Sequence, residues 1–467
     1  MVRSCWMLVI VVAVGRAAAQ EPEIPIHKLT ITPAAAPVPA LRFKLLPDLR
    51  ETTPGNAALI YYRAFAPDWS SHVRGNKEIR ERIDAAQDRP AAEVKTMMDL
   101  QFIRDWGMLK EVDRGARRAY CDWEMTPRLR EEGISMLLPD VQGLREFGRY
   151  LRLRAKLELA DGQFDKAAYS LQTGLQLGQH AAHGPTLIQG LVGAAITNVM
   201  LNEVEEWVGA PGSPNLYWAL TDLPQPFIDL RMGFQGERLM LDNLLPGFHE
   251  ALVDGHMRAL SQDQLHDIVS KLSQITDGRP PPMIAIVAIV AKNYGPAKQF
   301  LKERGWPEAD VEALPAVQVV LLHEAATYDR LYDEMLKWQG QPYAIARAGL
   351  DQADRQLKDE IARTGRQSLA SLLLPAVSKV YSAQARTDRN INRFRTIEAI
   401  RLYAAAHGKL PAQLADITEV PVPIDPYTGQ PFDYRLDGDT ATLTAPPPIG
   451  EPPHEGNSRR YEIKLAK

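Results

Sequence analysis

The chain has 467 residues, of which 45% are hydrophobic, so it carries enough apolar side chains for a large buried core. Its 54 basic and 58 acidic residues give a net charge of −4, and no cluster of Lys and Arg is interleaved with aromatic residues. This balance keeps a protein soluble, and it favours neither nucleic acid nor an anionic membrane as a partner.

Residues 1–20 have the order of an export signal, with Arg3 near the start, an apolar run over residues 6–14, and small residues at 17–19. The run is too short to span a bilayer core of about 30 Å. We therefore expect a cleaved signal peptide, a periplasmic or extracellular protein, and no membrane span after cleavage. A retained anchor is the alternative. Only Cys121 follows the signal, and we interpret it as a small apolar filler rather than a nucleophile.

Residues 21–52 contain six prolines, which oppose helix formation, and we expect an extended leader that buries little. From residue 53 to 386 the pattern changes to amphipathic helical segments, with a candidate break near 209–230. The main helices expected in this body span 90–105, 106–121, 141–160, 164–183, 186–208, 316–338, 343–363 and 368–386.

The segments at 141–160 and 164–183 are separated by Asp161-Gly162, so they are predicted to fold back and bury their apolar stripes on each other. This pair resembles one tetratricopeptide repeat in the placing of Ala155, Gly162, Phe164, Ala167 and Gly174. We find a single such unit, and stacked arrays normally need three or more.

The next helix, 186–208, is rich in small residues, which predicts close helix packing. Residues 184–226 resemble a group of exported bacterial proteins of unknown function, chiefly in the segments 185–190 and 215–220. This resemblance implies a layout and no activity.

After three prolines at 280–282, residues 283–291 form an uncharged apolar run. Nine residues are too few to span a membrane. We therefore expect this run to be a buried helix.

The C-terminal residues 387–467 have a different character. A helix is predicted to end at His407-Gly408, and alternating apolar residues at 432–436, 441–443 and 461–465 predict three strands. The expected fold class is therefore mainly α, a multi-helix bundle or array with a small C-terminal α+β module in which one helix packs on a three-stranded antiparallel sheet.

This module resembles the globular part of type II secretion pseudopilins. The residues that carry the resemblance are Ile397, Ile400, Tyr403, His407–Pro411 and Asp425–Arg435. The resemblance implies the helix-on-sheet fold, and it makes an accessory role in a secretion or pilus-like system one candidate function.

His323-Glu324 begins like the helix of a zinc peptidase, but Thr327 stands where the second histidine is required. Glu324 also falls in the middle of an apolar helical stripe, where a carboxylate needs a partner. We favour a hydrogen bond in the core from an arginine or tyrosine. The alternative is a site acid with a raised pKa.

Two further sets of residues are weak candidates for metal sites. His180 and His183 are three residues apart at the end of a helix, where we favour a role in completing the helix as cations near its C-terminus. Asp425, Asp437 and Asp439 could supply oxygen ligands to calcium, as in some pseudopilin modules, although Asp-Pro and Asp-Gly steps usually make turns.

No nucleophile elbow, phosphate-binding glycine loop or dinucleotide fingerprint occurs in the sequence, and we expect no cofactor. The favoured hypothesis is an exported, non-enzymatic scaffold or interaction protein with protein partners in the cell envelope. An extracytoplasmic hydrolase with a site near Glu324, and an accessory component of a secretion system, are the alternatives.

Overall fold

The protein is mainly helical, with a small sheet region formed largely by its C-terminal residues, as the sequence predicts. The computed structural model describes residues 24–66, 76–136, 138–275, 283–364, 368–448, 451–454 and 456–466. The expected signal peptide at 1–20 lies outside these ranges.

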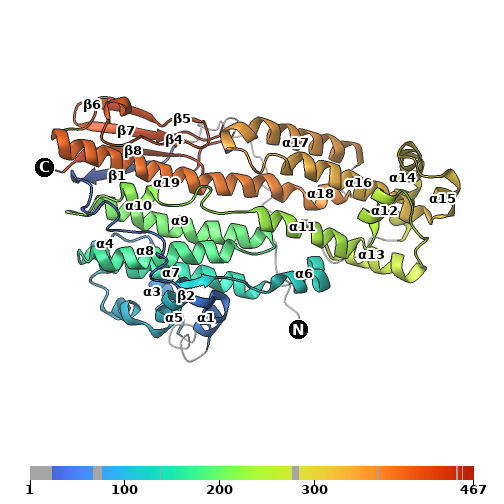
Figure 1. The fold of residues 1–467 in the computed structure, drawn as a ribbon, viewed down its shortest axis with the longest axis horizontal. Helices are drawn as coiled ribbons and strands as arrows, with labels where there is room; N and C mark the ends of the chain where they lie inside the picture. The colour runs from blue at the N-terminus through green and yellow to red at the C-terminus, as the bar shows by residue number, and fades with distance from the viewer. Residues whose placement is uncertain are drawn as a thin grey trace.

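The helices and strands follow in chain order, with those up to residue 209 as a first group and those from residue 217 as a second (Figure 1). The first group contains β1 (Ile26–Ile31), β2 (Thr53–Asn56), α1 (Ala57–Ala64), α3 (Lys77–Gln87), α4 (Ala91–Val94), a 3-10 helix (Met98–Asp105), α5 (Gly107–Ala116), β3 (Arg118–Tyr120), α6 (Met125–Glu132), a second 3-10 helix (Gly133–Ser135), α7 (Pro139–Ala160), α8 (Phe164–Ala182) and α9 (Leu187–Gly209). The second group contains α10 (Tyr217–Thr221), α11 (Arg231–Leu244), α12 (Phe248–Asp254), α13 (Gln262–Ile275), α14 (Met283–Glu303), α15 (Glu308–Ala313), α16 (Ala316–Leu336), α17 (Tyr343–Thr364), α18 (Leu369–Leu373), α19 (Pro375–His407), a third 3-10 helix (Leu414–Asp416), β4 (Ile424–Asp425), β5 (Gln430–Pro431), β6 (Asp433–Asp437), β7 (Thr440–Ala445) and β8 (Arg459–Leu465).

Helices α7, α8 and α9 form the central bundle, in which each helix packs on the other two. α8 and α9 approach closely because glycines lie between them: a Cβ atom at Gly178 or Gly193 would overlap the facing helix. The predicted pairing of α7 with α8 is confirmed, and Gly162 at their turn has a left-handed φ of 67°. The close packing predicted for 186–208 is also confirmed.

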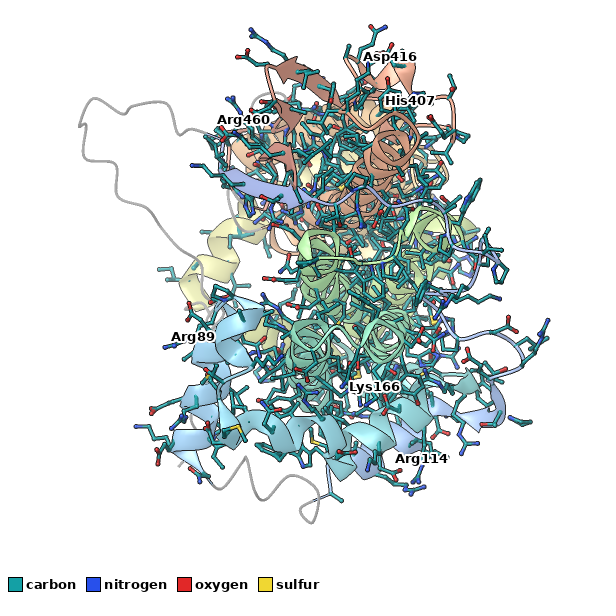
Figure 2. All side chains as sticks on the ribbon, turned by 90° about the vertical axis from the view of Figure 1, so that its left-hand side faces the viewer. Arg89, Arg114, Lys166, His407, Asp416 and Arg460 are labelled. Carbon is teal, nitrogen blue, oxygen red and sulfur yellow. The ribbon has the colours of Figure 1, made fainter. Side chains whose placement is uncertain are left out.

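The molecule is elongated and layered. In Figure 1 the sheet and α19 lie at the top left, the central bundle lies beneath them, and α14 and α15 lie at the opposite end of the long axis. The end-on view in Figure 2 shows the same layers, with Arg460 of β8 and His407 of α19 at the top, Lys166 of α8 in the lower middle, and Arg114 of α5 at the bottom. The sheet and the α14 end are therefore far apart.

The main sheet has the strand order β1-β8-β7-β6, so it contains four strands where the sequence predicts three. β6, β7 and β8 are antiparallel neighbours, as expected. The additional strand, β1, comes from the N-terminal leader and runs parallel to β8, with Ile26 opposite Arg460 and Ile31 opposite Leu465. A helix on three strands is thus an incomplete description of this region.

The leader buries more than we expected from its prolines. Leu29, Ile31, Phe43 and Leu45 are all buried. The prolines fall outside β1, so the backbone N–H groups of residues 26–31 remain available to the edge of β8. The partner strand is more than 400 residues away in the chain, and local composition therefore did not indicate the pairing.

A fully buried ion pair holds the leader against α19. Arg401 and Glu398 are both 0% exposed, and the guanidinium Nη1 lies 3.0 Å from each carboxylate oxygen. Arg401 also donates to the carbonyl oxygens of Thr32 and Ser213, and its own carbonyl accepts the N–H of Ala34. One side chain thus joins the leader, the loop after α9, and α19.

α19 continues without a break through the boundary expected between residues 386 and 387. Pro375 lies in its first turn, and Gly408, with φ 67°, ends it at the predicted place. α19 packs on α9, and residues of the sheet and of the helical body belong to one hydrophobic core. The sequence changes character near residue 387, but the packing does not.

Two helices predicted before residue 121 are shorter than expected. Residues 90–105 form the short α4 and then a 3-10 helix, and α5 ends at Ala116. Residues 118–120 form β3, which pairs with β2. Hydrogen bonds to a strand some sixty residues earlier override the local helical pattern.

Among the described residues, one helix is long and apolar enough to cross a membrane. This helix is α9, and 67% of its most apolar window is buried inside the protein. It lies between α8 and α19, which is the environment of a core helix.

We predict that Arg401→Met lowers the free energy of unfolding by about 3–5 kcal/mol, because it leaves the Glu398 carboxylate buried without its charged partner. The measurement is equilibrium unfolding in urea. Arg395→Met is the control: Arg395 lies on the same helix at a partly exposed position and donates to Thr221 and Asn392, with no carboxylate partner among the described residues, so its loss should cost about 1 kcal/mol. Equal midpoints for the two variants would contradict the assigned role of Arg401.

Candidate functional site

Glu324 lies on α16, and its carboxylate is used in the packing of a neighbouring helix. Its Oε2 atom accepts the backbone N–H of Leu369 at 3.1 Å, in the first turn of α18. The N-cap residue Ser368 accepts the N–H of Ser371 at the same helix end. The sequence predicts an arginine or tyrosine side chain as the donor to Glu324, whereas Leu369 donates to it through its backbone N–H.

His323, the neighbour of Glu324, packs against α14. Its ring lies edge-to-face on Phe300, with 4.8 Å between the centroids. His323 and Phe300 together connect α16 to the C-terminal half of α14, where Ala297 and Leu301 are fully buried. His323 therefore contributes to anchoring that half of the helix.

His180 is buried on α8 and is fully engaged. Its Nδ1 atom lies 2.9 Å from the Tyr61 hydroxyl, and its Nε2 atom lies 2.9 Å from the Gln176 amide nitrogen. Burial lowers the pKa of His180 to about 3, so the ring is neutral at physiological pH. The expected cationic role at the helix end is wrong for His180. His183 is the exposed C-cap residue of α8.

The three candidate calcium ligands are separated between two places. Asp425 is buried, and its Oδ2 atom accepts two hydrogen bonds from Arg389, at 3.0 and 2.6 Å. Asp437 and Asp439 are exposed at the β6–β7 turn, where Asp439 pairs with Lys464 at 3.2 Å. Across the described ranges, no group of three or more His, Cys, Asp or Glu side chains could hold a metal ion.

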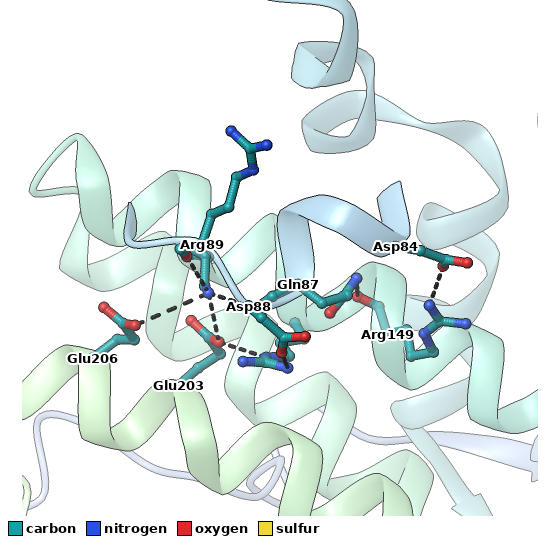
Figure 3. A network of polar contacts seen from close by, with 9 residues as sticks. Asp84, Gln87, Asp88, Arg89, Arg149, Glu203 and Glu206 are labelled. Atoms are coloured by element: carbon teal, nitrogen blue, oxygen red, sulfur yellow. Dashed lines mark hydrogen bonds and ion pairs between the residues drawn. The ribbon is translucent and has the colours of Figure 1, made fainter. Parts of the chain in front are cut away.

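The sequence did not indicate a buried charge network between α3, α7 and α9 (Figure 3). Lys156 of α7 is 1% exposed and donates to the carbonyl oxygens of Gln87, the last residue of α3, and of Arg89, both at 2.8 Å. Glu203 of α9 is fully buried, accepts from Arg152 at 2.8 Å, and lies 3.8 Å from the Lys156 amine. These contacts fix the end of α3 on the bundle.

Glu203 is the group in this network with the most perturbed titration. Burial raises its pKa to about 7, although Lys156 and Arg152 act in the opposite direction. A carboxyl of this kind could exchange a proton near neutral pH. Because Glu203 is 0% exposed and Lys156 1%, no substrate can reach them in this conformation, and we assign the network a structural role.

Glu205, two residues along α9, lies in a second cluster that faces the sheet. It accepts from His27 of β1 at 3.0 Å and from Arg459 and Tyr461 of β8 at 3.0 and 2.5 Å. Burial raises the pKa of Glu205, but these hydrogen bonds and the Arg459 charge outweigh it and lower the pKa to about 2. Glu205 is therefore a stable anion that ties the sheet to α9.

A hollow of about 350 Å³ lies at the start of α8. It is lined by Arg42, Phe43, Gly162, Gln163, Phe164, Asp165, Lys166 and Pro214. Arg42 and Asp165 form an ion pair in its wall, and both side chains are exposed to solvent. The hollow is thus a solvated surface, and it lacks the enclosed polar groups that orient a small substrate.

An apolar surface is exposed on the N-terminal half of α14. Four outward residues, Ile284, Val287, Ala288 and Ala291, are exposed, and they recur at helical spacing. Ile284 is 80% exposed and Val287 is 58% exposed. We call these four residues the α14 apolar face. No described side chain from 284 to 291 is fully buried, so the prediction of a buried helix for this run is wrong.

The physical reason for this difference is the position of the helix. One side of α14 packs on the protein, where Val290, Ala297 and Leu301 contact the core, whereas its other side faces outward at the end of the molecule (Figure 1). Hydrophobicity alone predicts burial, and nothing in the run indicates which partner covers it. Large apolar side chains exposed together on a folded protein mark a contact surface. The α14 apolar face is therefore the candidate functional site.

Comparisons with protein-family models, with curated proteins and with solved structures give no match to this chain.

We predict that Glu324→Ala lowers the free energy of unfolding by about 1 kcal/mol, because the N–H of Leu369 loses its acceptor. Glu324→Gln keeps an acceptor oxygen and should recover most of this loss. Urea titrations of the three proteins make the test, and equal losses in the two variants would argue that the charge of Glu324 matters instead.

The raised pKa of Glu203 predicts a pH effect on stability. Between about pH 4.5 and 7 the folded protein keeps a proton that the unfolded chain releases, so stability falls as pH rises, by up to about 3 kcal/mol from this group. Glu203→Gln should remove that part of the decline in urea titrations across this range. Glu206→Gln, on the same helix at a partly exposed position, is the control. A Glu203→Gln profile parallel to that of the unaltered protein would contradict the prediction.

Proposed function

We propose that the protein is an exported, non-enzymatic interaction protein of the cell envelope, and that the α14 apolar face is its contact surface. The single observation that carries the proposal is the exposure of Ile284 and Val287 on a helix with no charged residue from 283 to 291. Apolar side chains exposed to water raise the free energy of the folded protein, and a partner that covers them would lower it.

The rest of the molecule supports this role by its rigidity. Arg401 joins α19 to Thr32 and Ser213, the Arg389–Asp425 ion pair joins α19 to β4, and the central bundle is closely packed. A body of this kind holds the α14 apolar face in a fixed place. This is the property that a scaffold needs when it presents one surface to a partner.

For the C-terminal region we propose a unit of the pseudopilin kind, in which α19 covers the antiparallel strands β6 to β8. Two observations support this proposal: the His407–Pro411 phrase lies at the end of a helix, and Asp425–Arg435 leads into the sheet. β1 is then an addition to that unit, supplied by the leader.

We predict that the protein is exported and shortened by about 20 residues, and that its α14 apolar face contacts an envelope component. A photo-reactive benzoylphenylalanine at position 287 should form adducts in intact cells of an exporting bacterium. The same group at exposed position 166, on α8 and at the other end of the molecule, should form none.

Fractionation and mass spectrometry of the adducts make the measurement. Adducts at 287 with either an envelope protein or a lipid support the proposed function. Full-length protein retained in the cytoplasm, or equal labelling at 287 and 166, would contradict it.

A further inference from the structure

We propose that the α14 apolar face seats the protein on the surface of an anionic phospholipid bilayer, with its aliphatic side chains among the acyl chains and its flanking lysine at the headgroups. This inference rests on the proposed function, because it names the partner of the same surface. The occupant is the bilayer surface itself, and no segment crosses it.

The first argument is that the helix is apolar on both of its sides. Its outward side carries Ile284 and Val287, and its inward side carries Ile286 and Ile289, which are half-buried. The inward side packs on the protein, where Val290 contacts the core. The outward side is then the one free to enter a lipid interface, and from 284 to 291 it carries no polar side chain.

The second argument is the length of the run. Nine helical residues rise about 13 Å, which is less than half of a hydrocarbon core of about 30 Å. The run is therefore too short to span, but an interfacial helix needs to bury its apolar side only about 5–10 Å deep.

The third argument is charge complementarity with lipid phosphates. The first three charged residues after the run are Lys292, Lys298 and Lys302, and the first acid on α14 is Glu303. Lys298 and Lys302 already pair with acids on or at the start of α15, at 2.7 and 2.8 Å. Lys292 is exposed and has no ion pair among the described residues, so it is available to a phosphate.

Lys292 is also well placed along the helix. It follows Val287 by five positions and Ala291 by one, so it borders the α14 apolar face. Tyr294, two residues later, is half-buried against the protein core and lies on the inward side of the helix. Lys292 is thus the basic residue next to the α14 apolar face, where lipid phosphates lie when the face is inserted.

A second copy of the chain is a weaker occupant. A stable protein interface buries about 800 Å² on each partner, with some 20 to 30 residues a side. The α14 apolar face offers four outward residues, two of them alanines. Such a small area does not hold two copies together, whereas insertion in a bilayer requires no matching surface.

The apolar run at residues 6–14 could itself bind vesicles, so the test must report on α14 alone. A fluorophore is therefore attached within the α14 apolar face. The full chain with Cys5→Ser and Val287→Cys is labelled with an environment-sensitive nitrobenzoxadiazole, since Cys121 is buried. The probes are vesicles of phosphatidylcholine, with or without 30% phosphatidylglycerol. We expect a blue shift and quenching by spin-labelled lipids on anionic vesicles, and neither effect with the label at exposed position 345 of α17.

Two pairs of variants test the contributions, with a vesicle titration of the label as the readout. With the label at Ala291→Cys, Ile284→Glu should weaken vesicle binding of the helix at least about tenfold, and Ile345→Glu should not. Lys292→Glu should weaken binding to anionic vesicles about fivefold and leave neutral vesicles unchanged, and Lys166→Glu is its control.

The inference is overturned if the label at 287 shows no shift on either vesicle, if neutral and anionic vesicles act equally, or if the shift occurs without lipid in a dimer detected by light scattering. A protein adduct at 287 in cells without a vesicle response would remove the lipid inference and keep the proposed function. If position 287 gives no adduct in cells and the label gives no response to vesicles, both the lipid inference and the proposed function are contradicted.

Discussion

The structure depends on the position of α9 between two layers. Two carboxylates on this helix, Glu203 and Glu205, are two residues apart and therefore point to nearly opposite sides. Glu203 faces Arg152 and Lys156 on α7, and Glu205 faces His27, Arg459 and Tyr461 on the sheet. Close glycine contacts fix the distance from α8. α9 thus holds the bundle and the sheet in one arrangement, and both ends of the chain depend on it.

The two carboxylates respond differently to burial because their partners differ. Glu205 accepts hydrogen bonds from three donors, which stabilise its charge and lower its pKa to about 2. Glu203 is fully buried, its Oε2 atom has no hydrogen-bond partner, and its pKa rises to about 7. The same residue type therefore acts as a permanent anion on one side of the helix and as a titrating group on the other. The first connects layers at all physiological pH values, whereas the second lowers stability as it ionises.

A net charge of −4 describes the whole chain and conceals its local variation. On α14, nine apolar residues are followed by three lysines before the first acid, and two of these lysines are neutralised by α15. The rigid body keeps this surface exposed at the end opposite the sheet (Figure 1). Function in this protein is thus proposed from a place where the fold leaves apolar side chains uncovered.

The sequence by itself determined the helical class, the α7–α8 pair, the close packing of α9, the glycine stop at residue 408, and the three antiparallel strands, because each depends on local periodicity or on a turn residue. Only the tertiary structure decided the pairing of β1 with β8, the role of Glu324 at α18, the neutral state of His180, and the exposure of Ile284. The first three depend on a partner far away in the chain, and the exposure of Ile284 depends on there being no described element packed on the outward side of α14. Local patterns report how hydrophobic a residue is, but not which neighbour it meets.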